Sequence, residues 1–209
     1  MAHCLKNGIQ GLIAWAGDER AIVAVAFTDI RNSTARGDVL GNESWHELVE
    51  RHFSESARFT EQHNGFGISN LGDGEMLVFR TVEAALDYAL ALHGNPGVPD
   101  IEIRVGIHVG AIRVLADNIR GGAINYASRV NSATKAAEIW VSTRALELLL
   151  EEQAARHREL RWQQHPDIEL RGLGTHTLWS VSPTGPTLAE IADELRRTRT
   201  QRPTAEAAA

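Results

Sequence analysis

The spacing of apolar residues predicts short strands and helices that alternate along most of the chain. Residues 21–27 form a continuous apolar run containing Ile and Val, typical of a strand buried on both faces. From Glu43 to His63, apolar side chains recur mostly every three or four positions, which predicts an amphipathic helix ending at Asn64-Gly65. The glycine- and asparagine-containing stretch between these segments predicts a loop.

The middle of the chain carries a hairpin signal. Two strand-like pieces within 67–79 flank Gly72-Asp73-Gly74, which places Asp73 at the tip of a β-hairpin. Thr81 is expected to cap a helix that runs to His93. The remaining pattern predicts strands at 101–109, 111–116 and 139–142 and around 160, 170 and 178, with helices at 123–137 and 143–152.

The composition changes after Pro183. Thr187 and Glu190 form a capping-box pattern that predicts a short helix to about Arg197, and residues 202–209 are expected to be disordered. We therefore divide the chain into an N-terminal segment at 1–20, one domain at 21–182, and a C-terminal helix with a flexible tail at 183–209. The hairpins favour an α/β fold of the α+β sandwich type, with a mixed, mainly antiparallel sheet flanked by helices.

Composition and charge narrow the class of protein. A length of 209 residues suits a single domain, and 43% hydrophobic with 23% charged residues is typical of a globular protein. A formal net charge of −6 argues against broad nucleic-acid binding, although a small anionic substrate needs only a few local cations. With no membrane-length apolar run, no secretory signal pattern and one cysteine, Cys4, we expect a cytoplasmic protein without a nucleic-acid or membrane partner.

Two aspartates stand where strands end. Asp29 closes the buried strand and Asp73 tops the hairpin, so neighbouring central strands would bring them together. Two adjacent carboxylates repel unless a cation lies between them, and Mg²⁺ or Mn²⁺ prefers such oxygen ligands together with substrate phosphates. Taken singly, each residue also fits an ordinary role as a cap or a turn residue.

Three further polar residues suit a phosphate ester. Asn125 and Arg129 are four positions apart on a predicted helix and therefore share a face. Arginine offers paired donors to phosphate oxygens, and an asparagine amide can orient a ribose oxygen. Arg171, between apolar strand residues and glycines, could reach a terminal phosphate. Each of the three alone is also compatible with a solvated surface, and His108 is expected to pack rather than to catalyse.

The order of these motifs is more specific than any one of them. Phe-Thr-Asp-Ile-x-x-Ser-Thr, Leu-Gly-Asp-Gly, Gly-Ile-His-Val-Gly, Gly-x-x-Ile-Asn-x-Ala-Ser-Arg and Arg-Gly-Leu follow one another along the chain. This series resembles the catalytic domain of class III adenylate and guanylate cyclases over residues 22–181. The resemblance implies a ferredoxin-like cyclase fold and a homodimer with active sites at the subunit interface.

The resemblance also implies a role for each motif. Asp29 and Asp73 of one protomer would hold two Mg²⁺ or Mn²⁺ ions, helped by the backbone carbonyl of Ile30. From the other protomer, Asn125 would position the ribose and Arg129 would stabilise charge on the α-phosphate. Arg171 matches a family lysine that contacts the outer phosphates, a change that keeps the charge but alters the geometry.

The residues that would recognise the base depart from the family pattern. Adenylate cyclases of this family usually place a lysine four residues before the second metal aspartate and an aspartate seven residues before the asparagine. Here these positions hold Ser69 and Asn118, and the glutamate of guanylate cyclases is absent as well. Both residues donate and accept hydrogen bonds, so chemistry alone does not choose the base. Trp45 is a candidate to fill the space of a purine's second ring.

These departures favour a pyrimidine product. We expect no sensor, HAMP-like or transmembrane module before the motifs, and a nearly bare cyclase with altered base-recognition residues is similar to the Pycsar pyrimidine cyclases of bacterial anti-phage defence. Such enzymes make cyclic UMP or cyclic CMP, which a separate effector protein reads. An adenylate cyclase that makes cyclic AMP is the alternative, and an inactive nucleotide-binding homologue is a remoter one.

Overall fold

A single sheet organises the chain. The computed structural model describes residues 8–70, 72–115, 119–151, 157 and 159–200. The sheet has eight strands in the order β2-β3-β1-β4-β6-β8-β7, with β5 paired to β4. Among the described strands β4 and β6 pair in parallel and the other pairs are antiparallel, which confirms the predicted mixed, mainly antiparallel sheet. The strands are β1 (Arg20–Ile30), β2 (Phe66–Asn70), β3 (Gly74–Phe79), β4 (Ile103–Val114), β5 (Ile119–Arg120), β6 (Ile139–Ser142), β7 (Arg161–Leu170) and β8 (Gly174–Ser182).

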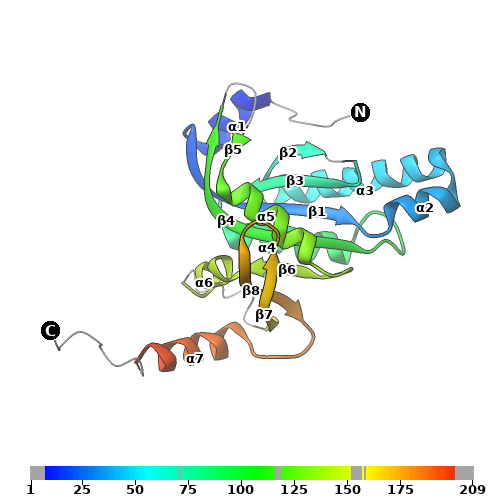
Figure 1. Cartoon of the computed structure of the whole chain (residues 1–209). Helices are drawn as coiled ribbons and strands as arrows, with labels where there is room; N and C mark the ends of the chain where they lie inside the picture. The colour runs from blue at the N-terminus through cyan, green and yellow to red at the C-terminus, as the bar shows by residue number, and fades with distance from the viewer. Residues whose placement is uncertain (1–7, 71, 116–118, 152–156, 158, 201–209) are drawn as a thin grey trace.

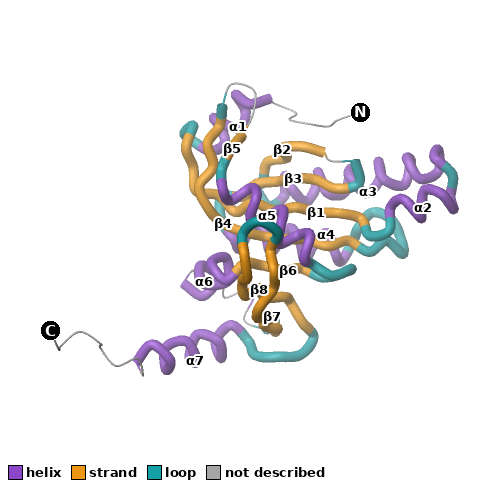
Figure 2. Tube along the Cα trace, in the orientation of Figure 1, coloured by secondary structure: helices purple, strands orange, loops and turns teal. Residues whose placement is uncertain are grey.

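Helices cover both faces of the sheet (Figure 1). Helices α1 and α5 pack on one face, whereas α3, α4 and α6 pack on the other. Helix α2 connects β1 to α3, and Figure 2 shows α2 and α3 side by side at one end of the molecule. The helices are α1 (Gly8–Ala16), α2 (Ser33–Leu40), α3 (Asn42–Gln62), α4 (Val82–Gly94), α5 (Gly122–Ala133), α6 (Thr143–Glu151) and α7 (Leu188–Thr200).

Strand β1 is an interior strand of the sheet, between β3 and β4. Val23, Val25 and Phe27 point toward the α1 and α5 side, while Ala24 and Ala26 point toward α4 on the opposite side. Alternate side chains of a strand face opposite sides of its sheet, so burial on both faces requires a continuous apolar run. The apolar run at 21–27 is thus the buried centre of a longer strand.

Two glycines let α5 lie directly on β4. An added Cβ at Gly106 would lie 2.3 Å from the backbone nitrogen of Asn131, and one at Gly110 would lie 2.9 Å from the Cβ of Ala123. The Gly-Ile-His-Val-Gly motif therefore brings α5 close to the sheet. The prediction of a separate strand at 111–116 was wrong, because Gly110 sits inside one continuous strand instead of a turn.

Several local signals are confirmed. The 43–63 helix is α3, and β2 and β3 form the hairpin around Asp73. The hydroxyl of Thr81 accepts a hydrogen bond from the backbone N–H of Ala84 at 3.1 Å, as expected of the cap of α4. The carboxylate of Glu190 accepts from the backbone N–H of Thr187 at 2.7 Å, which completes the predicted capping box.

Two unpredicted helices and one helix boundary differ from the predictions. The predicted loop after β1 contains α2, a helix without a clear apolar period, in which Gly37 gives room to the indole of Trp45. Helix α5 ends at Ala133 instead of 137, because the hydroxyl of Thr134 donates to the carbonyl of Val130 and the backbone there becomes extended. The N-terminal segment contains α1, whose Leu12 is buried in the core.

The predicted disordered tail at 202–209 lies outside the described residues, and α7 places Leu188 and Ile191 against the core. Within the described residues no helix combines the length and the apolar character needed to cross a membrane.

Candidate functional site

The two predicted metal aspartates meet at the carboxyl end of β1. In the sheet register Asp29 lies between Gly74 of β3 and Arg104 of β4. Asp73 immediately precedes Gly74, and its carbonyl accepts a hydrogen bond from the backbone N–H of Ile30 at 3.1 Å. The hairpin and the central strand therefore bring Asp29, Ile30 and Asp73 together.

These three residues line an open pocket of about 380 Å³. Its other wall is the start of α2, where Asn32 adopts a left-handed conformation (φ 56°) that turns the chain from β1 into the helix. The hydroxyl of Ser33 donates a hydrogen bond to the carboxylate of Asp73. Backbone N–H groups in the first turn of a helix have no partner within the helix, so this wall suits an anion.

Arginines face the aspartates in the same pocket. The Nε and Nη2 atoms of Arg104 each lie 2.6 Å from Oδ2 of Asp29, and Arg31 also lines the pocket. Burial raises the pKa of Asp29 above its usual value, the Arg104 guanidinium opposes that rise, and the Asp73 carboxylate adds to it. The negative charge on Asp29 is therefore incompletely compensated by Arg104, which is the condition a bound cation would relieve.

The donor set fits a hard divalent ion that is shared with a substrate. Two carboxylates and a backbone carbonyl supply oxygen ligands, the type preferred by Mg²⁺ and Mn²⁺. In the part of the chain that the structure describes, no cluster of three His, Cys, Asp or Glu side chains is arranged to hold a metal. The remaining ligands would therefore come from phosphate oxygens and water.

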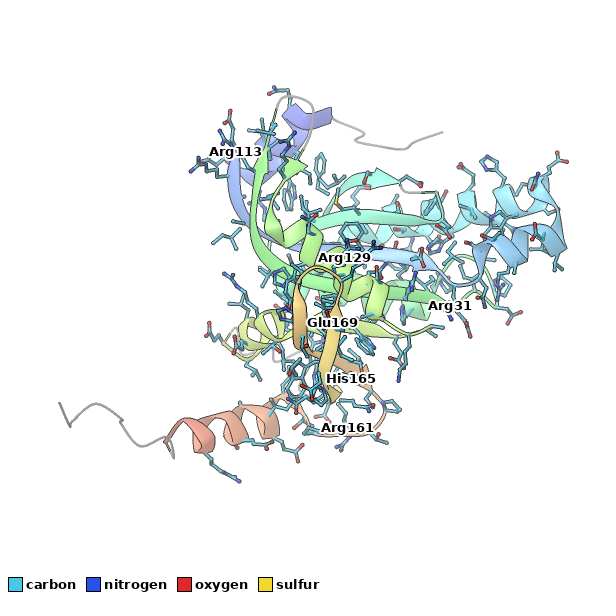
Figure 3. The ribbon with its side chains drawn as sticks, in the orientation of Figure 1. Arg31, Arg113, Arg129, Arg161, His165 and Glu169 are labelled. Carbon is cyan, nitrogen blue, oxygen red and sulfur yellow. The ribbon has the colours of Figure 1, made fainter. Side chains whose placement is uncertain are left out.

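Asn125, Arg129 and Arg171 lie apart from this pocket. Asn125 is exposed and Arg129 is half-buried on α5, and neither lines the pocket of the aspartates. Arg171 is exposed in the turn between β7 and β8, which contact α5 through β7. Figure 3 shows Arg129 beside this hairpin and Arg31 at the far end of β1. One chain thus divides its predicted site residues into two groups.

The predicted base-reading residues have different surroundings. Ser69 pairs with Met76, which in turn pairs with Phe27, so Ser69 lies on the same sheet face as Asp29. Asn118 lies outside the described residues.

Trp45 packs inside the chain. Its indole contacts the Gly37 position of α2, and it joins a small apolar cluster with Ile30, Val49 and Phe53. The structure thus gives Trp45 a packing role, and its influence on the base stays a prediction.

Arg104 and Ser33 were not predicted from the sequence as site residues. The pairing of Arg104 with Asp29 joins strands 75 residues apart, so no local pattern reveals it. Ser33 belongs to the Asp-Ile-x-x-Ser-Thr motif, and its position in that motif was the available signal.

A buried polar cluster supports the hairpin from the opposite face. The hydroxyl of Ser56 donates to Glu75 and accepts from Tyr88 at 2.7 Å. Burial raises the pKa of Glu75 to about 7, although the Ser56 hydrogen bond opposes the rise. This cluster ties α3 and α4 to the strand that follows Asp73.

Comparison with known protein families identifies one family that covers most of the chain. The model of the adenylate and guanylate cyclase catalytic domain family matches residues 18–182. An adenylate cyclase of Streptomyces coelicolor is 28% identical over 146 residues, which cover 67% of this chain and 38% of that protein. An adenylate cyclase of Mycobacterium tuberculosis is 25% identical over 206 residues, which cover 86% of this chain and 43% of that protein. The chain therefore spans less than half the length of these relatives.

Solved structures share the fold. The adenylyl cyclase CyaB from P. aeruginosa aligns with a TM-score of 0.68 at 22% identity, covering 80% of this chain and 97% of that chain. The guanylate cyclase domain of RhGC from Catenaria anguillulae was solved in complex with GTP. It aligns with a TM-score of 0.66 at 21% identity, covering 77% of this chain and 96% of that chain. At these identities the likeness establishes the architecture of the domain.

Proposed function

Because the chain belongs to the family of class III adenylate and guanylate cyclase catalytic domains, we propose that it converts a nucleoside triphosphate into a 3′,5′-cyclic monophosphate and pyrophosphate. The observation that carries this proposal is the pocket in which Asp29 and Asp73 face Arg104 and the start of α2. Carboxylates for metal ions stand there next to cationic groups for phosphates. A triphosphate bound through divalent ions needs this combination.

The reaction forms one bond and breaks one. The 3′-oxygen of the ribose attacks the α-phosphorus and loses its proton, while the bond from the α-phosphorus to the bridging oxygen breaks and pyrophosphate leaves. Two divalent ions, held by Asp29, Asp73 and the carbonyl of Ile30, would acidify the 3′-hydroxyl and neutralise the phosphates when bound.

The chain's own groups orient the substrate around this bond change. The guanidinium of Arg104 and the backbone N–H groups in the first turn of α2 would hold phosphate oxygens. Ser33 keeps the carboxylate of Asp73 turned toward the pocket. Charge placement, without a covalent intermediate, lowers the barrier.

The site is completed by a second copy of the chain. Within one protomer Asn125 and Arg129 do not line the pocket of the aspartates. In a homodimer these residues from one protomer would face Asp29 and Asp73 of its partner, as the family resemblance implies. Asn125 then orients the ribose, Arg129 stabilises charge on the α-phosphate, and Arg171 contacts the outer phosphates.

A cyclic pyrimidine nucleotide is the product we favour. Ser69 supplies a short neutral group at a position where adenylate cyclases usually carry lysine. Asn118 stands where they usually carry the aspartate that recognises adenine. A site that recognises adenine through buried, charged side chains discriminates strongly between bases, because a wrong base leaves these side chains without hydrogen-bond partners. That discrimination is lost with short neutral residues. The product, cyclic UMP or cyclic CMP, would act as a second messenger that a separate effector reads in anti-phage defence.

An adenylate cyclase is the second candidate, and a specific observation favours it. The relatives from Streptomyces coelicolor and Mycobacterium tuberculosis are both named adenylate cyclases. Ser69 and Asn118 can also donate to and accept from adenine.

One experiment tests the activity and the base together. Purified chain is incubated with Mn²⁺ and ATP, GTP, UTP or CTP at equal concentration, and cyclic products are identified by mass. We expect UTP or CTP to be cyclised fastest. An ATP preference contradicts the pyrimidine assignment and supports the adenylate candidate, whereas no cyclic product from any nucleotide contradicts the proposed function.

Trp45→Ala tests how the base is selected. If Trp45 fills the space of a purine's second ring, the variant will cyclise ATP and GTP faster relative to UTP and CTP. Phe53→Leu, which alters the same apolar cluster behind Trp45, serves as the control. If the ratio of purine to pyrimidine cyclisation rates is unchanged in Trp45→Ala, Trp45 has a packing role alone.

A further inference from the structure

Three aromatic rings link β4, α5 and β8. The imidazole of His108 stacks on the ring of Tyr126, with centroids 4.1 Å apart and planes at 25°. The ring of Tyr126 meets the imidazole of His176 edge to face, with centroids 5.0 Å apart and planes at 77°. The imidazole of His108 is also hydrogen-bonded to Ser142, whose hydroxyl oxygen lies 2.7 Å from Nδ1. Such ring pairs are attractive and strongly oriented.

His176 also holds the turn between β7 and β8. Its Nε2 lies 3.0 Å from the carbonyl oxygen of Leu173, to which it donates. The backbone N–H of Leu173 donates in turn to the carbonyl of Leu170 at 2.8 Å, which closes the turn around Arg171. His176 therefore links the turn that carries Arg171 to Tyr126, in addition to the apolar cluster that Tyr126 shares with Leu170.

Tyr126 holds the other end of the connection. It directly follows Asn125 on α5 and precedes Arg129 by less than one helical turn. Helix α5 already lies against β4 at Gly106 and Gly110, and the stack on His108 restrains its rotation and sliding over the strand. Asn125 and Arg129 thus share one rigid helix with the ring that contacts the hairpin.

We propose that Tyr126 and His176 are positioning residues, whose ring contact holds the Arg171 turn against α5 so that Arg171, Asn125 and Arg129 act on the triphosphate as one unit. This inference rests on the proposed function for its consequence in catalysis. The geometry of the rings and the turn stands independently of it. Neither positioning residue contacts the substrate in this proposal.

The same hairpin provides a matched control. His165 of β7 stacks on Trp140 of β6, with centroids 4.2 Å apart and planes at 10°. It lies near the base of the hairpin, away from the turn, as Figure 3 shows. His165→Leu and His176→Leu therefore each remove an imidazole with an aromatic contact from the same hairpin, but only His176→Leu removes the hydrogen bond to the turn.

Steady-state kinetics separate positioning from general packing. With the nucleotide that the wild-type protein uses, His176→Leu should raise KM about 3- to 10-fold, the range expected for loss of one aromatic pair. Tyr126→Leu, which loses the pairs with both His108 and His176, should raise KM at least as much. His165→Leu should leave KM unchanged. Tyr126→Phe should retain the wild-type KM, because the contacts of Tyr126 with both imidazoles are made by its ring.

A double-mutant cycle shows whether the effect passes through Arg171. In an Arg171→Ala background, His176→Leu should change KM less than about twofold, because the turn then carries no guanidinium to misplace. Equal effects of His176→Leu in both backgrounds, or equal effects of His165→Leu and His176→Leu, would overturn the proposal.

Amide hydrogen exchange tests the same idea without catalysis. The backbone N–H groups at 171–173 should exchange faster in Tyr126→Leu and His176→Leu than in wild type or His165→Leu. A chain that makes no cyclic nucleotide but shows this pattern refutes the proposed function and keeps the positioning role of the rings. Unchanged exchange at 171–173 in both variants overturns the positioning role, whatever the activity.

Discussion

At the scale of single residues, opposing charges define the end of β1. Asp29 is partly buried near a second carboxylate, and its ion pair with Arg104 compensates that cost only in part. In the proposed site, a cation beside Asp29 would take over the role of Arg104 and leave its guanidinium to the phosphates. The carboxylates of Asp29 and Asp73, which repel each other, would together attract the metal ions of a bound triphosphate.

Asp73→Ala tests this arrangement. We expect cyclisation to fall by at least about 100-fold, since a charge that stabilises the transition state is removed. The melting temperature should change little, because Asp73 lies at a half-exposed hairpin tip. Pyrophosphate release and thermal unfolding measure the two effects. Asp38→Ala, an exposed carboxylate on α2, should keep wild-type activity. Full activity in Asp73→Ala would contradict the two-metal assignment.

His108 should make the stability of the protein depend on pH. Burial lowers its pKa to about 4, with Arg144 and His176 adding to the shift. The unfolded chain then binds a proton more readily than the folded chain, so the stabilisation is complete above about pH 6.5 and is lost as pH falls toward 4. Between pH 7.5 and pH 5, His108 should cost the folded state about 2 kcal/mol.

The free energy of unfolding, measured with urea at pH 7.5 and at pH 5, checks this expected difference in stability. His108→Gln should lose most of this contribution to the pH dependence, whatever its stability at pH 7.5. His46→Gln, which changes an exposed histidine of α3, should retain the wild-type dependence. If the free energy of unfolding depended on pH equally in His108→Gln and in wild type, the pKa of His108 would not be lowered in the folded protein.

At the scale of elements, the placement of α5 on β4 decides where half of the proposed site lies. The glycines at 106 and 110 allow backbone contact between helix and strand, and the Tyr126 stack fixes the helix in place. The α2 and hairpin elements similarly build the other half around Asp29 and Asp73. Each half is held by packing within one chain.

Gly106→Ala should displace α5. The added Cβ would lie 2.3 Å from the backbone nitrogen of Asn131, and backbone atoms cannot rotate away as a side chain can. We expect a loss of about 3 kcal/mol, or a melting temperature lower by roughly 6–12 °C. Gly122→Ala, in the first turn of α5 with open space around it, should leave the melting temperature nearly unchanged or slightly higher. Scanning calorimetry of both variants makes the comparison, and equal melting temperatures would rule out close packing at Gly106.

At the scale of the whole molecule, one protomer keeps its two groups of site residues apart. The aspartates lie at the end of β1, whereas Asn125, Arg129 and Arg171 lie on α5 and the β7–β8 turn. A homodimer would contain two identical sites if each protomer lent one group to its partner. The assembly, and not the single chain, would then be the active unit.

Mixing inactive variants tests this arrangement. Asp73→Ala and Arg129→Ala proteins, each inactive alone, should recover roughly a quarter of wild-type activity after exchange, because half of the dimers are mixed and each has one intact site. Mixing Asp73→Ala with Asp29→Ala should restore nothing, since both changes fall in the same group and damage both sites. No recovery in the first mixture, with mixed dimers demonstrated, would locate the site within a single chain.

Local pattern was sufficient for most of the secondary structure. A continuous apolar run predicted the buried centre of β1, a three-to-four spacing predicted α3, and Asp-Gly predicted the hairpin. These features depend on backbone periodicity and turn chemistry, which act over a few residues. Local pattern failed for α2, whose sequence lacks an apolar period, and at Gly110, where the glycine reflects a neighbouring helix and not a turn.

The sequence by itself therefore determined the fold class, the family and the candidate residues Asp29, Asp73, Asn125 and Arg129. Only the tertiary structure decided how these residues are grouped. Arg104 pairs with Asp29, Ser33 donates a hydrogen bond to Asp73, and Asn125 and Arg129 do not line the pocket of the two aspartates. Each of these relations concerns segments far apart in the chain. The reason is physical: strand register and helix placement result from packing over the whole core, and no short window of sequence contains both partners of such a contact.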